Sequence, residues 1–437
     1  MSSACLNDRH ATGLDETGGL AHIGRMTTTL ETGPETEVLI SGGGFAGLAL
    51  AIALGRAGLA VAVVEPARAT GTESAFDGRV SSIAPDVRRM LTGLGVWARI
   101  PESQSVSDIV VSGGTVGGAA SPFFLHFERE DGGAPPFDMV ENRFLQAALR
   151  ATALDVPGLR LIDGARITEV ATIPGRIAAT LSTGETIAAP LLVAAEGRDS
   201  PLRDRFGIKT AGWSYGQWGI VCTVAHERPH EGVAQEYFLP SGSFAILPMT
   251  GNRASLVWTE REDLAKAVMA LDAADFAAEV ARRFTDYLGA VTPLAAPSAW
   301  PLALQLARDY IAPRFALIGD AAHVVHPLAG QGLNLGLRDA AALAEAVVDA
   351  GRLGLDIGGM APLEAYQRRR RIDATLMAGM TEGLNRLFSN DAAPLRAVRE
   401  AGLGLVNAVT PLRRFLARAA GGTELGEAPR LLKGEAL

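Results

Sequence analysis

The sequence predicts an α/β protein: a parallel sheet flanked by helices, interrupted by a β-sheet domain and followed by a helical C-terminal region. Short apolar runs at Glu37–Ser41 and Leu59–Val64 enclose a helical stretch from Phe45 to Arg56, the pattern of parallel strands buried on both faces. Short runs broken by Pro-Gly and Thr-Gly pairs across residues 159–194 are typical of an antiparallel meander, and residues 214–259 are similarly β-rich.

Composition narrows the classes of function. Hydrophobic residues make up 48% of the 437 residues and charged residues 20%, as in folded globular proteins. The net charge of −8 argues against nucleic-acid binding. The two cysteines, Cys5 and Cys222, provide neither a disulfide framework nor a metal site, and their number fits a reducing, cytoplasmic compartment. Glycines interrupt the longest uncharged run, Val38–Gly55, so we expect no membrane span.

The first motif is a glycine turn, Gly42-Gly43-Gly44-Phe45-Ala46-Gly47, placed between the first apolar strand and the helix. Gly42 permits the tight turn, Gly44 lets the backbone approach a pyrophosphate, and Gly47 lets helix and strand pack closely. The phosphates then lie against the amides of the helix N-terminus. Glu65 ends the second strand, 18 residues beyond Gly47, where a carboxylate can bind a ribose hydroxyl. Together these features predict dinucleotide binding, and no second such turn occurs in the sequence.

Another motif begins at Asp320, which an apolar strand at Phe315–Ile318 places at a sheet edge. A carboxylate there can bind a chain of sugar-like hydroxyls. His326-Pro327 and then Gly330-Gln331-Gly332-Leu333-Asn334 follow, at the start of a helix running to about Ala350. The positive end of that helix suits the electron-rich edge of a reduced flavin. A weaker motif, Ala195-Glu196-Gly197-Arg198, follows the strand at Leu191–Ala194 and alone would be interpreted as a charged turn.

The three motifs resemble those of class A flavoprotein aromatic monooxygenases, which have the para-hydroxybenzoate hydroxylase fold. The run from His326 to Ala340, HPLAGQGLNLGLRDA, resembles the UbiH-type hydroxylases of ubiquinone biosynthesis. Val140-Glu141-Asn142, Trp300-Pro301-Leu302 and Gly383–Phe388 show the same similarity, which extends over residues of about 36 to 420.

The resemblance implies a domain organisation. We expect an FAD-binding domain in three parts, a substrate domain in two parts, a disordered leader and a C-terminal helical region. The expected bounds are 1–35 for the leader, 36–110, 136–212 and 306–360 for the FAD-binding domain, 111–135 and 213–305 for the substrate domain, and 361–437 for the helical region.

The resemblance also implies site residues. The ADP part of FAD would contact the glycine turn and Glu65, the ribityl chain Asp320, and the flavin ring Pro327 and residues 330–334. Arg79 and Arg143 match arginines beside the cofactor. The full cofactor-binding set is Gly42, Gly44, Phe45, Ala46, Gly47, Glu65, Arg79, Arg143, Asp320, Gly330, Gly332, Leu333 and Asn334. The family usually has Asp-Gly where this chain has Glu196-Gly197, which puts a cofactor contact by Glu196 in doubt.

The activity implied is hydroxylation of the aromatic ring of a polyprenyl-phenol in ubiquinone biosynthesis, with O₂, through a flavin C4a-hydroperoxide. NAD(P)H or a ferredoxin-type donor would reduce the FAD. Such chemistry belongs to the cofactor and needs neither a protein nucleophile nor a metal. Two alternatives stay open: a hydroxylase of a small soluble phenol or polyketide, and a non-catalytic flavoprotein scaffold among other members of a ubiquinone-biosynthesis complex.

Histidines of the Asp320 motif have a catalytic and a structural interpretation. His326 directly precedes the flavin-facing Pro327, so it is our candidate base for a phenol. The alternative, which we favour, is a structural loop histidine. His323 is expected to pack beneath the motif and bond to backbone, and Arg338 and Asp339 are expected to form structural ion pairs.

The C-terminal region carries excess positive charge. From Arg368 to Arg418 there are ten arginines and four acids, a net charge of +6, so the rest of the chain carries −14. Apolar residues from Leu395 to Val409 recur at helical spacing. A basic amphipathic helix can lie on an anionic membrane such as the inner membrane, or pack on the protein with its arginines solvated. Both alternatives stay open.

Overall fold

The computed structural model describes residues 35–68, 76–114, 116, 124–128, 135–239, 241–284, 287–327, 330–388 and 427–437. The expected leader, apart from residue 35, lies outside these residues. So does the predicted basic helix at 396–418, together with Leu328 and Ala329 of the Asp320 motif.

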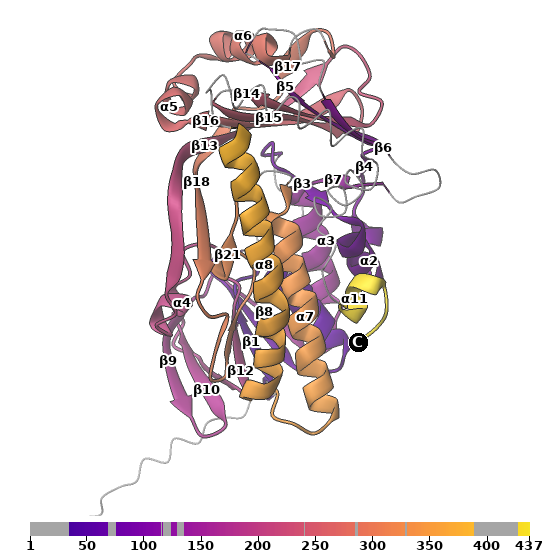
Figure 1. Ribbon diagram of the computed structural model, residues 1–437. Coiled ribbons are helices and arrows are strands. Elements are labelled where there is room, and N and C mark those ends of the chain that lie inside the picture. Colours follow the sequence, from indigo (N-terminus) through magenta and orange to yellow (C-terminus); the bar gives the residue numbers. More distant parts are fainter. Residues whose placement is uncertain are drawn as a thin grey trace, which may run out of the picture. The chain divides into compact units, whose positions relative to one another are not determined.

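A six-stranded sheet forms the centre of the FAD-binding part (Figure 1). Its order is β19 (Ile311–Ala312), β20 (Phe315–Leu317), β12 (Leu191–Ala194), β1 (Val38–Ser41), β2 (Val61–Glu65) and β8 (Leu159–Asp163). All neighbours pair in parallel except β19, which is antiparallel to β20. The interpretation of residues 159–163 as part of the meander was therefore wrong, because Leu159 pairs in parallel with Val61 and extends the sheet.

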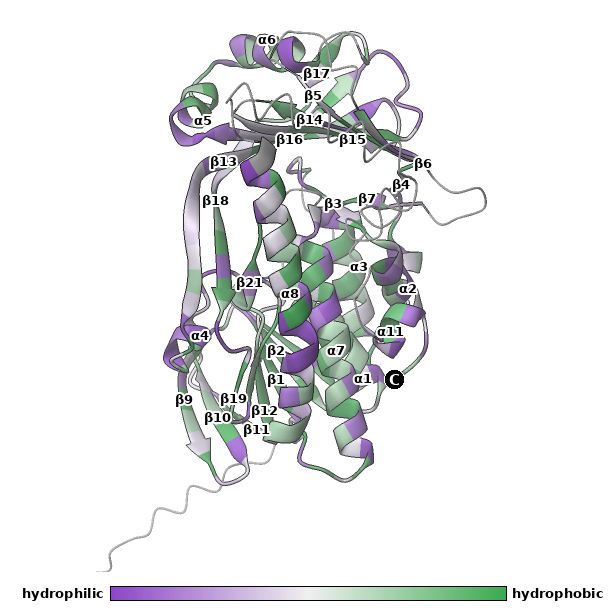
Figure 2. Ribbon diagram, viewed as in Figure 1, coloured by the Kyte–Doolittle hydropathy of each residue, from purple (hydrophilic) through white to green (hydrophobic). Residues whose placement is uncertain are grey.

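Four long helices pack around this sheet: α1 (Phe45–Arg56), α3 (Asn142–Leu154), α7 (Gly332–Arg352) and α8 (Met360–Phe388). Figure 2 shows β1, β2 and β12 mostly in hydrophobic colours, and their residues, apart from Glu65 at the end of β2, are almost completely buried. A Cβ at Gly336 of α7 would lie 3.1 Å from Cα of Gly319 and 3.6 Å from Cβ of Ala46. Glycine at position 336 thus lets α7 approach both the first turn of α1 and the turn before Asp320.

Two smaller sheets lie beside this core. The first is the predicted antiparallel meander, β9 (Ile167–Ile173), β10 (Arg176–Leu181) and β11 (Thr186–Ala189). The second has the order β3 (Val80–Ile83), β7 (Asp138–Glu141) and β4 (Gln104–Ser105). The shorter helical elements are α2 (Pro85–Gly93), η1 (Trp97–Arg99), α4 (Pro201–Arg205), η2 (Gly319–Ala321) and α11 (Arg430–Lys433).

The large sheet joins strands from distant parts of the sequence. Its order is β21 (His323–Val324), β18 (Ser298–Ala307), β13 (Thr210–His226), β16 (Arg253–Arg261), β15 (Gly242–Met249), β14 (Val233–Leu239), β5 (Asp108–Gly113) and β6 (Phe124–Glu128), with β17 (Val291–Pro293) paired to β13. Helices α5 (Glu262–Met269) and α6 (Ala273–Phe284) cover one face (Figure 1). The other face is turned toward the FAD-binding part, because its Ala234 packs with Ala84 and Met139.

Candidate active site

The glycine turn brings the backbone of β1 and the start of α1 very close to neighbouring backbone. A Cβ at Gly42, whose φ is +109°, would lie 2.3 Å from the carbonyl oxygen of Ala195, and one at Gly47 would lie 2.0 Å from the carbonyl oxygen of Gly42. The side of Gly44 is different: no heavy atom lies within 4 Å of its Cβ position. Helix α1 has no side-chain cap, so the amides of Phe45 and Ala46 can bind phosphate.

Glu65 lies beside this turn and binds it directly. One carboxylate oxygen accepts a hydrogen bond from the Gly43 N–H at 2.6 Å, and the other accepts from Ala67 N–H at 2.9 Å. Each oxygen keeps a further lone pair for a ribose hydroxyl. Gln146 of α3 donates from Nε2 to the Gly43 carbonyl at 2.9 Å. Sequence reasoning missed Gln146, because only the packing of α3 brings it to the turn.

We expect Glu65→Ala to weaken binding of FAD more than that of FMN, which lacks the adenosine. A lost hydrogen bond to a charged group costs about 1.5–3 kcal/mol, or roughly ten- to a hundredfold in affinity. Titration of the apoprotein with each flavin measures the two constants, and Glu65→Gln, which keeps an acceptor oxygen, should lose less. Equal weakening of FAD and FMN by Glu65→Ala would show that Glu65 acts only by bracing the turn.

Asp320 lies in η2, directly after β20. Its side chain is open to solvent, yet protein atoms surround it on most sides, and the resulting desolvation raises the pKa of its carboxyl. A solvent-reached carboxylate in such a recess can bind the hydroxyl chain of a ribityl group. The recess adjoins the start of α1, since a Cβ at Gly319 would lie 3.6 Å from Cβ of Ala46.

A fully buried ion cluster supports the turn that carries Asp320. The carboxylate of Asp339 accepts from Gly319 N–H at 2.9 Å, from His323 Nε2 at 2.6 Å and from Arg370 Nε at 2.7 Å. Burial alone would raise the pKa of Asp339, but His323 and Arg370 lower it. The expected ion pair of Asp339 is confirmed, as is that of Arg338, which binds Asp86 through two nitrogens. The expectation that His323 bonds to backbone was wrong, because its Nε2 bonds to the side chain of Asp339 instead.

The N-terminus of α7 is the second open helix end. Gly330, at φ +62°, precedes it, α7 has no side-chain cap, and no atom lies within 4 Å of a Cβ at Gly332. The backbone amides of Gly332 and Leu333 can therefore bind an anionic group. The Asn334 side chain is completely buried: it accepts from Ala84 N–H and donates to the Ser82 carbonyl, both at 2.9 Å. That side chain holds the end of β3, so only backbone of Asn334 can serve a cofactor.

His326 has a structural environment. Its side chain is almost completely buried, and its ring meets that of Tyr215 edge-on with centroids 4.9 Å apart. Burial lowers the pKa of His326 to about 4, so it is neutral at pH 7 and a weak base. These features favour the structural interpretation over the catalytic one. Pro327 follows at the surface of the same segment, where it is partly exposed.

The low pKa of His326 makes stability depend on pH. Between pH 6.5 and about 4 the unfolded chain binds a proton at His326 that the folded protein does not. Stability therefore falls as pH falls through this window, by roughly 3 kcal/mol from this group. In urea unfolding at pH 7, 5.5 and 4, His326→Gln should lose correspondingly less stability than wild type. Parallel pH curves for the two proteins would contradict this assignment.

The two cofactor-side arginines differ in their surroundings. Arg79 is exposed and pairs with Asp77 at 2.7 Å. Arg143 donates to Glu141 at 2.7 Å, and its guanidinium lies over the rings of Phe144 and Phe76, 4.5 and 5.4 Å from their centroids. Arg143 is thus packed against two aromatic rings at the start of α3, whereas Arg79 is exposed and is held by its ion pair with Asp77.

The side chain of Glu196 forms hydrogen bonds within the protein. One carboxylate oxygen accepts from Ser41 Oγ at 2.7 Å, and the other accepts from Ser200 Oγ at 2.6 Å and Leu202 N–H at 3.1 Å. The longer side chain therefore ties the end of β1 to the start of α4. With both oxygens occupied in this way, Glu196 has a structural role in this chain.

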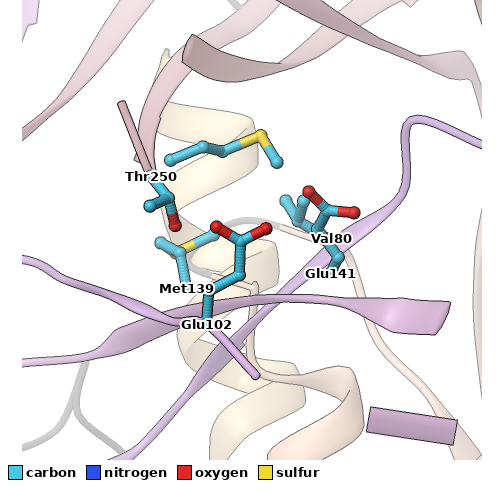
Figure 3. A pocket seen from close by; sticks show the side chains of 6 residues that line it. Val80, Glu102, Met139, Glu141 and Thr250 are labelled. Carbon is cyan, nitrogen blue, oxygen red and sulfur yellow. The ribbon is translucent and has the colours of Figure 1, made fainter. Parts of the chain in front are cut away.

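A small cavity lies where β3, β7 and β15 meet. It is lined by Val80, Glu102, Met139, Glu141, Met249 and Thr250, and both carboxyl groups point into it (Figure 3). Its volume of about 10 Å³ has room for a single water. Arg253 of the large sheet binds Glu141 at 3.0 Å and approaches Glu102 at 3.7 Å. This cavity is therefore an ion-paired contact between sheets, too small for a substrate.

The site as a whole fits FAD. Two uncapped helix ends, one beside Glu65 and the other following the turn of Asp320, offer amides to the pyrophosphate and to the flavin, with carboxylates for ribose and ribityl hydroxyls. Within the described residues, no group of His, Cys, Asp and Glu side chains could hold a metal ion. The arrangement defines a flavin-dependent oxidoreductase.

The chain belongs to the FAD binding domain family, whose profile matches residues 35–378. Ubiquinone hydroxylase UbiL of Rhodospirillum rubrum is 47% identical over 415 residues, covering 92% of this chain and 95% of that protein. The 3-demethoxyubiquinol 3-hydroxylase of Escherichia coli is 34% identical over 407 residues, covering 88% and 97%. The protein is thus an FAD-dependent monooxygenase.

Solved structures share the fold. The p-nitrophenol 4-monooxygenase PnpA of Pseudomonas putida DLL-E4 matches with a TM-score of 0.74 at 18% identity, covering 90% of this chain and 99% of that one. Klebsiella pneumoniae HpxO, complexed with FAD and uric acid, matches with a TM-score of 0.71 at 18% identity, covering 90% and 98%. At these identities the likeness concerns the fold alone.

Proposed function

We propose that this enzyme hydroxylates the aromatic ring of a polyprenyl-phenol intermediate in ubiquinone biosynthesis, using O₂. The observation that carries the proposal is the 47% identity, over nearly the full length of both chains, to a protein named ubiquinone hydroxylase. When bound, FAD supplies the activation of O₂ and the transfer of one oxygen atom to the ring. NAD(P)H or a ferredoxin-type donor is the proposed reductant.

The residues of this chain bind and orient the cofactor. The amides at the start of α1 hold the pyrophosphate, Glu65 the ribose, and Asp320 the ribityl chain. Amides of Gly332 and Leu333 stabilise negative charge at the flavin edge. The flavin ring and the substrate must also be shielded from water. The face of the large sheet opposite α5 and α6 is suited to this, because it is turned toward the FAD-binding part.

Mass spectrometry of quinone intermediates in a deletion strain tests the proposal. The strain should accumulate a polyprenyl-phenol that lacks a ring hydroxyl, and the accumulated compound identifies the ring position. Ubiquinone at the wild-type level, with no accumulated precursor, would contradict the proposal. Full complementation by an FAD-free Asp320→Ala protein would instead indicate a non-catalytic scaffold in a biosynthetic complex.

Peripheral contact with the inner membrane is a second part of the proposal, and it rests on the sequence. Of the ten arginines between 368 and 418, Arg369, Arg370 and Arg386 form ion pairs with Glu345, Asp339 and Glu382. The five arginines from Arg396 onward lie outside the described residues. No described helix combines the length and the hydrophobicity needed to cross a bilayer.

If the arginines of this tail bind lipid, the protein should bind anionic liposomes, bind neutral ones poorly, and lose binding as salt is added. Each arginine near the surface contributes about 1 kcal/mol, which salt screens. Replacing Arg413, Arg414 and Arg418 with glutamine should weaken liposome binding and leave the flavin content intact. Unchanged liposome binding by that triple variant would refute the membrane contact.

A further inference from the structure

The face of the large sheet toward the FAD-binding part is defined by the alternation of side chains along β14. Tyr237 and Leu239 pack in the apolar cluster beneath α5 and α6. Ala234, Glu236 and Phe238 therefore point to the opposite face. The packing of Ala234 with Ala84 and Met139 agrees with this, because both belong to the FAD-binding part.

Strand register places Glu236 in a row across this face. Val111 of β5 and Ala245 of β15 flank it directly, and Val257 of β16 lies beyond Ala245. Val111, Glu236 and Val257 are partly exposed, although each has a hydrogen-bonded strand on either side. Partial exposure at the middle of a sheet face indicates open space beneath it.

Contacts on two sides bound this space. On one side, the row of Ala234 and Leu247 packs on the FAD-binding part. On the other side, Gln217 of β13 accepts from Asn385 at the end of α8, at 3.2 Å. The row of Glu236 lies between these two contacts. A ring held between the sheet and the flavin would meet apolar side chains and one carboxyl group.

The surroundings of Glu236 suit acid–base work. Neither Val111 nor Ala245 is charged, and Ser243, diagonally opposite on β15, donates a hydrogen bond to the carboxylate. Although the side chain is partly exposed, the protein atoms around the carboxyl group desolvate it, and this raises the pKa of Glu236 to about 7. A group with a pKa near the working pH is the most effective general base.

We propose that Glu236 accepts a hydrogen bond from the phenolic hydroxyl of the substrate and removes its proton as the ring is hydroxylated. The O–H bond breaks, its electron pair stays on the phenol oxygen, and the proton passes to a carboxylate oxygen. The increased electron density on the phenol oxygen makes the ring a better nucleophile toward the incoming oxygen atom. This inference rests on the proposed phenol substrate and goes beyond it by assigning the base.

The test is single-turnover hydroxylation by holoenzyme reduced with dithionite and mixed with O₂, so that no biological reductant is needed. The substrates are short-chain alkylphenols with increasing fluorine substitution, which lowers the phenol pKa from about 10. Glu236→Gln should react about 100-fold more slowly than wild type with the unsubstituted phenol. With the most acidic phenol, which is already ionised, the difference should shrink to less than about tenfold, while FAD content stays unchanged. The rate of Glu236→Asp with the unsubstituted phenol should fall between those of wild type and Glu236→Gln.

Glu262→Gln is the matched control, because Glu262 lies on α5 over the other face and pairs with Lys266 at the surface. It should match wild type with every phenol. A Glu236→Gln protein that matches wild type, that loses rate equally with all phenols, or that loses its FAD would overturn the role of Glu236. A wild-type enzyme that hydroxylates no phenol of the series would overturn the phenol substrate itself.

Discussion

Asp320→Ala should lose most of its FAD while remaining folded. The carboxylate is reached by solvent just after the end of β20. Within the described residues, no hydrogen bond to this carboxylate helps to hold the fold together. In the proposed binding mode, its removal deletes charge-assisted hydrogen bonds to the ribityl chain, worth about 1.5–3 kcal/mol each. Affinity should fall by roughly ten- to a hundredfold per bond. The flavin-to-protein absorbance ratio after gel filtration measures the loss, and circular dichroism reports the fold.

Asp309→Ala is a suitable control, because this neighbouring aspartate is exposed and only approaches Arg371, at 3.9 Å. It should retain its flavin. Asp320→Asn, which keeps one acceptor oxygen, should retain more FAD than Asp320→Ala. Full flavin retention by Asp320→Ala would contradict the assignment of this motif to the cofactor.

Among the variants proposed for this protein, Asp339→Ala should lower the free energy of unfolding the most. It removes the carboxylate that binds Arg370, His323 and the amide of Gly319, all within a region that water does not reach. Removing one partner of a buried ion pair costs about 3–5 kcal/mol, since the remaining charge stays desolvated. Urea unfolding of the apoprotein measures this cost without the contribution of bound flavin.

The control for this prediction is Glu185→Ala, which breaks an ion pair with Arg160 in which both side chains are exposed. Exposed pairs contribute about 1 kcal/mol or less, so this variant should stay close to wild type. If Asp339→Ala unfolds no more readily than Glu185→Ala, the buried cluster does not hold the Asp320 turn in place.

The sequence predicted best what is local along the chain. The strand, turn and helix around Gly44 needed only glycine spacing and apolar runs, and the described helix begins and ends at the predicted residues Phe45 and Arg56. Asp320 and the start of α7 could likewise be inferred from one continuous motif. Their side-by-side position depends on the contact between Gly319 and Gly336, which no local pattern reveals.

The missed features depend on contacts between distant segments. Residues 159–163 have a strand pattern that fits either sheet, and only pairing with Val61 decides. Gln146 reaches the glycine turn across 103 positions of sequence. In the sequence, Glu236 is one polar residue in a β-rich stretch. Its place on the face toward the FAD-binding part depends on the register of three neighbouring strands. The motif also gave no sign that the side chain of Asn334 binds backbone about 250 residues earlier in the chain, which leaves only its backbone for the predicted cofactor contact.

Isotope labelling during one turnover tests the central claim most directly. Holoenzyme reduced with dithionite is mixed with ¹⁸O₂ and a polyprenyl-phenol in detergent micelles, and the mass of the product is measured by mass spectrometry. The account predicts a product carrying one ¹⁸O atom in a new ring hydroxyl, formed by wild type and not by the flavin-depleted Asp320→Ala protein. A product without the label, or oxidation of the flavin with no hydroxylated product from any phenol, would contradict it.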